Sequence, residues 1–182
     1  DTLDVKSTPT FFINGEKAQF RTVEDARKAL NTVLSGKTLG QEAKDTAKKL
    51  LLAQPDDQVL GKPKAKLTII EYVNIGCPHC GEFHNMLIET LRKDYIDSGK
   101  VKLVFREFPM SPPAFHAYML ANCRGKESFF DTISLLIQEG STWTGEQVFF
   151  GPLRAIAEKA GMTKEAFYAC MENQEVATRV AN

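Results

Sequence analysis

The stretch LTIIEYVNIGCPHC, residues 67–80, decides how this chain folds. Its first half, residues 67–73, is a short apolar run rich in β-forming side chains, which predicts a buried strand. The run ends at Asn74-Ile75-Gly76, and a Cys-x-x-Cys pair follows directly. Residues 82–97 then carry apolar side chains at helical spacing, which predicts a helix closed by Gly99. The cysteine pair is therefore expected at a strand-to-helix junction.

This position of the pair favours redox chemistry. Unpaired backbone N–H groups and the helix dipole stabilise a thiolate at a helix N-terminus, and the thiolate is the attacking species in disulfide exchange. We therefore expect Cys77 to be the exposed nucleophile and Cys80, one turn later on the same face, to resolve the mixed disulfide. Pro78 fits an early helical position. His79 can add positive charge near the thiolate or donate a hydrogen bond to it. Either effect favours the reduced form and makes the disulfide a stronger oxidant.

Two other interpretations of the pair are weaker. A zinc site would need a second ligand pair at standard spacing, and the remaining candidates do not form one: His79, His84, Cys123 and Cys170. We therefore expect no metal. A purely structural disulfide between Cys77 and Cys80 would close a loop too short to constrain the chain much.

Glu71 is a carboxyl inside the apolar run, six positions before Cys77. Burying a carboxyl is costly unless it is used or paired, so the position favours a functional group. The alternative is that Glu71 faces solvent at a strand edge.

The chain begins with a predicted strand, strand and helix, and its last part, beyond Pro109, is predicted to be helical. Residues 7–13 lead into Asn14-Gly15, a strong hairpin-turn signal, and the returning strand is expected near residues 18–20. Thr22 is the predicted N-cap of a helix, with Asp25 three residues later. A second helix is expected within residues 41–54 and a strand at residues 101–108. Beyond Pro109 the pattern is almost entirely helical.

Composition narrows the function classes. The 182 residues are 43% hydrophobic and 25% charged, with 23 Lys+Arg balanced by 23 Asp+Glu. This suits a folded domain and gives no reason to expect nucleic acid or an acidic membrane surface as partner. No run is long and apolar enough for a membrane span, and the first residues do not read as a signal peptide. Four cysteines fit two disulfides.

Two motifs together resemble the DsbA-like thiol:disulfide oxidoreductases. Residues 69–72 followed by Cys77-Pro78-His79-Cys80 resemble the active-site strand and helix of that family. STPTFFING, residues 7–15, resembles its cis-proline loop and hairpin. Residues 112–173 resemble the helical domain that such proteins insert. The resemblance implies an α/β thioredoxin fold with an inserted helical domain.

The order of the motifs departs from the family, in which the active site precedes the cis-proline hairpin. We interpret this as circular permutation, because Val176 and Val180 begin a helical stripe that Leu3 and Val5 would continue. Asp1 and Asn182 should then lie close together, as should residues 34 and 41. A fragment of a longer chain and a swapped assembly are the alternatives. The predicted parts are residues 1–34 (cis-proline hairpin and last helix), 35–40 (linker joining the former termini), 41–110 (active site), 111–172 (inserted helical domain) and 173–182 (return segment to the thioredoxin fold).

The resemblance also assigns residue roles. It implies a cis Thr8–Pro9 bond, with the Thr8 backbone pairing with an extended substrate segment and its side chain touching the active-site sulfur. It makes Glu71 a proton acceptor near Cys80. It implies a structural disulfide between Cys123 and Cys170, the alternative being two free buried thiols. His84 and His116 are interpreted as structural or surface residues.

The function implied by the resemblance is the oxidation of dithiols in newly exported proteins. A DsbB-like membrane quinone reductase would reoxidise the protein, no metal or organic cofactor is needed, and the expected compartment is the periplasm. We expect a monomer. A disulfide isomerase or reductase would share the motif, but no separate dimerisation domain is evident. Other enzyme classes on the fold lack this cysteine pair. A redox-inert peptide-binding module is the non-enzymatic alternative, which thiol titration would separate.

Overall fold

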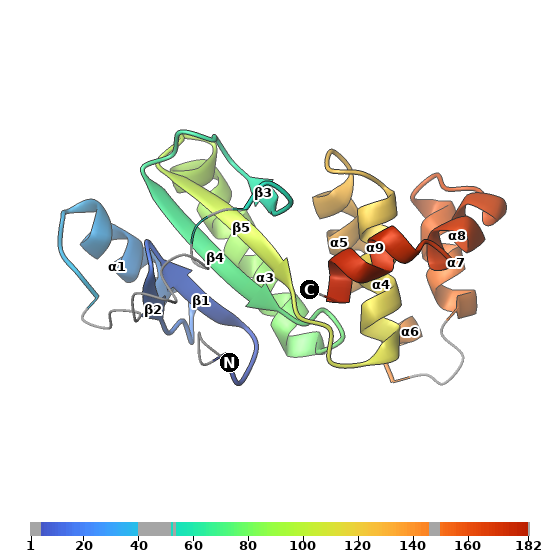
Figure 1. Ribbon diagram of the computed structural model, residues 1–182. Coiled ribbons are helices and arrows are strands. Elements are labelled where there is room, and N and C mark those ends of the chain that lie inside the picture. The colour runs from blue at the N-terminus through green and yellow to red at the C-terminus, as the bar shows by residue number, and fades with distance from the viewer. Residues whose placement is uncertain (1–4, 40–51, 53, 146–149, 182) are drawn as a thin grey trace. The chain divides into compact units, whose positions relative to one another are not determined.

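The computed structural model describes residues 5–39, 52, 54–145 and 150–181 (Figure 1). The chain divides into two compact units. The sheet unit comprises Asp1–Val73 and Phe83–Arg106, and the helical unit comprises Asn74–Glu82 and Glu107–Asn182. The helix expected within residues 41–54 falls almost wholly outside the described residues.

The sheet has five strands in the order β2-β1-β4-β5-β3. Their bounds are β1 Thr10–Ile13, β2 Glu16–Ala18, β3 Gln58–Leu60, β4 Leu67–Val73 and β5 Val101–Glu107. β1 pairs antiparallel with both β2 and β4, and β3 pairs antiparallel with β5. β4 lies between β1 and β5, and every one of its residues is buried or half-buried, which agrees with its nearly continuous apolar sequence.

The β1–β2 hairpin turns at Asn14 and Gly15, which both have positive φ, 47° and 91°. That is the backbone an Asn-Gly turn requires. The returning strand was predicted at residues 18–20, and this was wrong by two residues. A two-residue turn leaves no spacer, so β2 begins at Glu16 and Phe11 pairs with Ala18.

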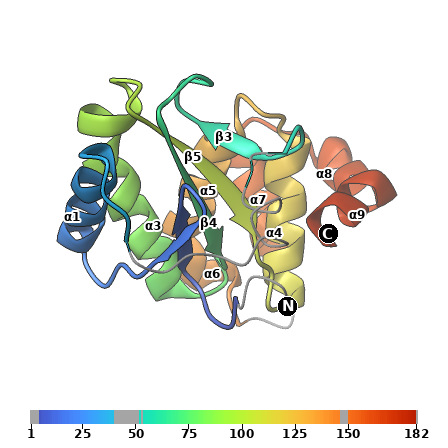
Figure 2. The same ribbon diagram turned by 60° about the vertical axis from the view of Figure 1, so that its left-hand side comes forward.

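Two helices pack on one face of the sheet: α1, Val23–Leu34, and α3, Pro78–Leu91, which a π-helical turn η1 prolongs over Arg92–Ile96. Figure 2 shows α1 and α3 side by side. The core between helices and sheet includes Phe11, Ile13, Ala26, Leu30, Ile69, Leu87, Leu91 and Leu103. The predicted N-cap of α1 is confirmed, because Thr22 and Asp25 form a reciprocal capping box.

The helical unit contains α4 Pro112–Cys123, α5 Phe129–Gln138, α6 Gly140–Trp143, α7 Phe150–Lys159, α8 Lys164–Met171 and α9 Gln174–Ala181. Ser111 caps α4, and two prolines occupy its first turn, where a missing N–H has no cost. α4 is the central helix, in contact with α5, α7, α8 and α9. It is buried around most of its circumference, as its sequence of small and apolar side chains permits.

α9 packs on α4 and belongs to the helical unit. Residues 173–182 are predicted from the sequence to return the chain to the thioredoxin fold, whereas the structure groups α9 with the other helices of the helical unit. Residues 1, 41 and 182 lie outside the described residues, so the permuted order stays a prediction. None of the helices in the described ranges has the length and apolar character needed to span a bilayer.

Candidate active site

Cys77 stands immediately before the first residue of α3, as the sequence predicted. Its N–H donates to the carbonyl of Asn74 over 3.1 Å, and its own carbonyl accepts from the N–H groups of Cys80 and Gly81, each over 3.1 Å. Cys77 is therefore the N-cap of a helix 14 residues long. This is the end of a helix at which the N–H groups of the first turn lack partners within the helix and the helix dipole is positive.

The two cysteines differ in accessibility. Cys77 is partly exposed, whereas Cys80 is only 4% exposed. Their Sγ atoms lie 2.8 Å apart, close enough to bond with a small adjustment of either side chain. Pro78 is the first residue of α3, and the His79 side chain is 95% exposed. An incoming thiol can therefore reach Cys77 more readily than Cys80.

The loop between β4 and α3 is fixed by contacts within the helical unit. The N–H of Ile75 donates to the hydroxyl of Tyr118 over 3.0 Å, and the N–H of Gly76 donates to Asn74 Oδ1 over 3.0 Å. A Cβ on Gly76 would lie 3.0 Å from the Cβ of Ala114 and 3.1 Å from Asn74 Oδ1, so a larger residue would require these neighbours to shift by a small amount. Tyr118 is not among the residues predicted for the site, because it lies 43 positions from Ile75 and carries no local signal.

Glu71 and His84 form a buried pair in the sheet unit. Glu71 is fully buried and His84 is 2% exposed, which excludes the solvent-facing alternative for Glu71. His84 Nδ1 lies 2.7 Å from Glu71 Oε2. Glu71 Oε1 has no hydrogen-bond partner among the described residues. The sequence predicted a functional carboxyl at Glu71 but not its partner, because His84 was interpreted as a structural or surface residue.

The Thr8–Pro9 peptide bond is cis and immediately precedes β1. Thr10 pairs with Tyr72, so the bond lies at the end of the sheet where β4 finishes. In the helical unit, a disulfide joins Cys123 at the end of α4 to Cys170 in α8, with Cα atoms 6.0 Å apart. The described residues contain no cluster of three or more His, Cys, Asp or Glu side chains that could hold a metal ion.

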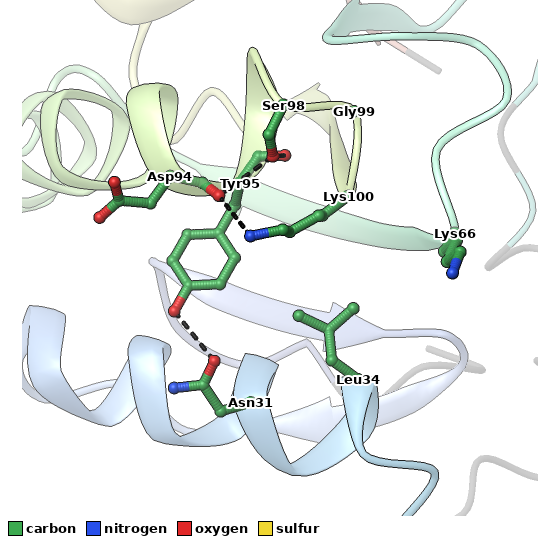
Figure 3. A pocket seen from close by; sticks show the side chains of 8 residues that line it. All are labelled: Asn31, Leu34, Lys66, Asp94, Tyr95, Ser98, Gly99 and Lys100. Carbon is green, nitrogen blue, oxygen red and sulfur yellow. Dashed lines mark hydrogen bonds between the residues drawn. The ribbon is translucent and has the colours of Figure 1, made fainter.

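A surface pocket of about 600 Å³ opens in the sheet unit (Figure 3). Tyr95 projects across it, its hydroxyl donating to Asn31 Oδ1 over 3.0 Å, and Lys100 Nζ lies 5.8 Å from the centre of the tyrosine ring. The pocket contains none of the cysteines and none of the residues predicted for the site.

The chain is similar to known proteins over most of its length. The family model described as Thioredoxin matches residues 53–182. Alpha-DsbA1 from Wolbachia pipientis is 30% identical with a TM-score of 0.68, and the match covers 74% of this chain and 68% of that one. Oxidised BdbD from Bacillus subtilis is 26% identical with a TM-score of 0.58, covering 69% and 70%. A Rickettsia prowazekii protein provisionally named a protein-disulfide oxidoreductase is 31% identical over 129 residues, 70% of this chain and 47% of the relative.

The chain spans about half the length of the curated Rickettsia relatives that it matches. The family match begins after the hairpin segment, so residues 7–34 lie outside it. Within the match lie the active-site strand β4, the cysteine pair and all of the helical unit. The chain therefore belongs to the thioredoxin family, in its DsbA-like group.

Proposed function

We propose that this protein is a thiol–disulfide oxidoreductase that exchanges its Cys77–Cys80 disulfide with cysteine pairs of other proteins. The observation that carries the proposal is the asymmetry of the pair. One sulfur is accessible at a helix N-terminus, and the other lies 2.8 Å away and is almost fully buried. A nucleophile that meets substrate and a partner shielded from it are what a two-step exchange requires.

In the oxidising direction, a substrate thiolate attacks Cys77 Sγ, and the Cys77–Cys80 bond breaks with its electron pair going to Cys80. A second substrate thiolate then attacks the substrate sulfur of the mixed disulfide, and Cys77 leaves as a thiolate. The substrate loses two electrons and the protein gains them. In the reverse direction, Cys80 attacks Cys77 and resolves the mixed disulfide.

We propose oxidation as the working direction. The N-terminus of α3 favours the Cys77 thiolate, and His79 in the first turn adds positive character when protonated. Stabilising the thiolate stabilises the reduced form, which makes the disulfide the stronger oxidant. Pro78 contributes a preformed first helical turn.

We propose the substrates, the compartment, the recycling partner and the oligomeric state from the similarity to the DsbA-like group. The substrates are reduced, unfolded exported proteins in the periplasm, and a DsbB-like membrane quinone reductase restores the disulfide. The working form is a monomer that needs no cofactor. Thr8 and Pro9 are proposed to bind an extended substrate segment, and Glu71 to accept the Cys80 proton. The name of the Rickettsia relative is consistent with this assignment.

We also propose the permuted order, with residues 35–40 joining the former termini and residues 111–172 as the insertion. Support comes from β1, which pairs with β4 although the hairpin precedes the active site in sequence. A chain in which residues 41–182 precede residues 1–34 should fold and exchange disulfides like the present one. If the rearranged chain stays unfolded, permutation is excluded.

The decisive experiment places the protein in glutathione buffers of graded potential and measures the fraction of Cys77–Cys80 disulfide by mass after acid quenching. A midpoint more oxidising than the glutathione couple supports an oxidase, and a reducing midpoint supports a reductase. Cys80→Ser should accumulate a mixed disulfide with a disulfide-bonded protein substrate, because the Cys77 thiolate attacks the substrate disulfide and no Cys80 thiol is present to resolve the product, whereas Cys77→Ser should not. If neither disulfide nor mixed disulfide forms, the pair is inert and the peptide-binding alternative stands.

A further inference from the structure

Five lysines gather at the end of the sheet unit where β4 begins. Three of them, Lys62, Lys64 and Lys66, belong to the loop between β3 and β4. The other two, Lys100 and Lys102, flank the first residue of β5. We propose that this lysine cluster docks the protein on the surface of an anionic lipid bilayer. The inference goes beyond the proposed function and does not rest on it, because lipid binding is measured without any disulfide exchange.

Contacts within the sheet unit hold the two lysine-bearing segments against each other. The N–H of Leu67 donates to the carbonyl of Lys100 over 3.1 Å. A Cβ on Gly99 would lie 2.9 Å from Cδ and 3.5 Å from Nζ of Lys62, so the Lys62 side chain runs directly over this glycine. The lysines of the loop and those of β5 therefore share one surface.

The charge of the lysine cluster is not balanced by carboxylates. Residues 58–70 and 98–106, which carry the cluster, contain no Asp and no Glu. Asp94 and Asp97, in the turn before β5, are each paired with an arginine. Within the part of the chain that the structure describes, none of the five lysines forms an ion pair. A surface that gathers one sign of charge in this way attracts a partner of the opposite sign.

Two of the ammonium groups are held by carbonyl groups, which leave their positive charge uncompensated. Lys100 Nζ donates to the carbonyl of Asp94, and Lys102 Nζ donates to the carbonyl of Pro63, each over 3.3 Å. Four of the five lysines are exposed, and Lys102 is half-buried. Lys66 and Lys100 also line the surface pocket of the sheet unit (Figure 3), so an anionic headgroup that enters the pocket meets both side chains.

The chemistry of the lysine cluster favours a bilayer over a protein as its partner. Protein interfaces are depleted in lysine, and aromatic, methionine and arginine side chains are enriched in them. The cluster contains lysine alone, and residues 61–66, which carry three of its members, include no large apolar side chain. Lysine is a point charge on a flexible stem, so it needs no fixed geometry in its partner. Basic clusters of this size attract the anionic headgroups of a bilayer.

Composition gave no reason to expect this partner, because 23 basic and 23 acidic residues balance over the whole chain. Charges in salt solution act over a Debye length of about 10 Å, so the local arrangement of charge decides whether a surface attracts anions. β4 begins beside the cluster and ends at Val73, roughly 20 Å away along the strand. Docking through the cluster therefore keeps the end of β4 that leads to Cys77 away from the lipid.

The test titrates the whole chain with lipid vesicles and measures the lipid concentration at which half of the protein floats with them. One set of vesicles is phosphatidylcholine alone, and the other contains equal parts of phosphatidylcholine and anionic phosphatidylglycerol. The informative variant combines Lys62→Gln, Lys64→Gln and Lys66→Gln. The matched control replaces three exposed lysines of the helical unit by Gln, and so removes the same charge: Lys126, Lys159 and Lys164.

We expect the wild-type protein to bind the vesicles that contain phosphatidylglycerol and not those of phosphatidylcholine alone. Raising the salt concentration to about 0.5 M should release it, because salt screens the attraction. The triple variant of the cluster should need about a hundredfold more lipid for half-binding, since each lysine near an anionic surface contributes about fivefold. The control variant should stay within about threefold of the wild type, because its lysines lie outside the cluster.

Equal weakening in the two triple variants would overturn the proposal, because net charge and not the cluster would then govern binding. A wild-type protein that ignores both kinds of vesicle, or binds both alike, would overturn it too and leave the lysines as solvated residues at the end of the sheet. If the triple variant of the cluster does not fold by circular dichroism, Lys64→Gln alone decides. About fivefold weaker binding supports the proposal, and unchanged binding overturns it.

Discussion

The backbone N–H of Ile75 donates a 3.0 Å hydrogen bond to the hydroxyl oxygen of Tyr118, and both residues are buried. Ile75 lies in the loop that leads from β4 to Cys77, and Tyr118 lies in the middle of α4. The bond therefore gives the loop before the nucleophile a fixed backbone position within the helical unit. No other partner of the Ile75 N–H is recorded among the described residues.

Tyr118→Phe should lower the free energy of unfolding by about 1–3 kcal/mol, because it keeps the ring but leaves the Ile75 N–H unpaired in the interior. The looser loop should also slow alkylation of Cys77. Urea denaturation and alkylation kinetics measure the two effects. Tyr168→Phe, on an exposed residue of α8, is the control and should change neither. Equal stability of Tyr118→Phe and wild type would mean that the loop finds another acceptor.

The Cys123–Cys170 disulfide of the helical unit should stabilise the fold and take no part in disulfide exchange with other proteins. Cys123 and Cys170 are 47 positions apart, and a bond across that separation restricts the unfolded chain. Replacing both by Ala should cost about 3–4 kcal/mol of unfolding free energy while the Cys77–Cys80 equilibrium with glutathione stays the same. A shift of that equilibrium in the double variant would show that the second disulfide also tunes the active site.

The parts of the site that the sequence predicted are those with local signals. The Cys-x-x-Cys spacing, the apolar run of residues 67–73 and the following helical periodicity together located the junction at Cys77. The Asn14-Gly15 turn located the hairpin. The cis Thr8–Pro9 bond and the pairing of Cys123 with Cys170 had no local signal, and only the family resemblance implied them.

The parts that were missed depend on contacts between distant residues. His84 meets Glu71 across 13 positions, and Tyr118 meets Ile75 across 43, so neither partner is marked by its own neighbours. β3 is three residues long, Gln58–Leu60, and too short for any periodic pattern. It forms because β5 offers an edge for antiparallel pairing. Such elements follow from the assembled sheet and not from local sequence.

Arg106 of β5 forms hydrogen bonds with Asp57, in the segment before β3, and with Tyr72 of β4. Its Nε and Nη2 donate to the two carboxylate oxygens of Asp57 over 3.1 and 3.0 Å, and its Nη1 donates to the Tyr72 hydroxyl over 2.7 Å. Burial alone would lower the pKa of Arg106, but the hydrogen bonds to Asp57 and Tyr72 outweigh burial and raise it. The two side chains of the ion pair are only 14% and 10% exposed, so water screens it weakly.

Asp57→Ala should therefore cost about 2 kcal/mol of unfolding free energy, because it leaves a largely buried guanidinium with fewer partners. Asp97→Ala is the matched control. Its partner Arg92 lies 3.9 Å away, both side chains are at least 60% exposed, and the expected cost is below about 0.5 kcal/mol. Urea denaturation of both variants gives the comparison. Equal costs would mean that the geometry of the Arg106 pair adds nothing to stability.

The capping box of α1 should make part of the stability depend on pH. The N–H groups of Arg21 and Thr22 donate to Asp25 Oδ2 over 3.0 and 2.9 Å. These hydrogen bonds, that from Arg21 foremost, hold the pKa of Asp25 below its ordinary value of 3.8. Because the pKa is lower in the folded state, the carboxylate stabilises the fold above pH 3.8, and this contribution is lost as the pH falls through the folded-state pKa.

Asp25→Asn should thus be less stable than the wild type at pH 7 and at pH 5, and the difference should shrink once the pH falls below 3.8. Urea midpoints at pH 7, 5 and 3 measure it. Glu24→Gln, a neighbouring carboxylate in the same first turn, controls for the attraction of any negative charge to the helix N-terminus. A difference between Asp25→Asn and wild type that is as large at pH 3 as at pH 7 would assign the effect to side-chain shape, because the charge is then no longer its source.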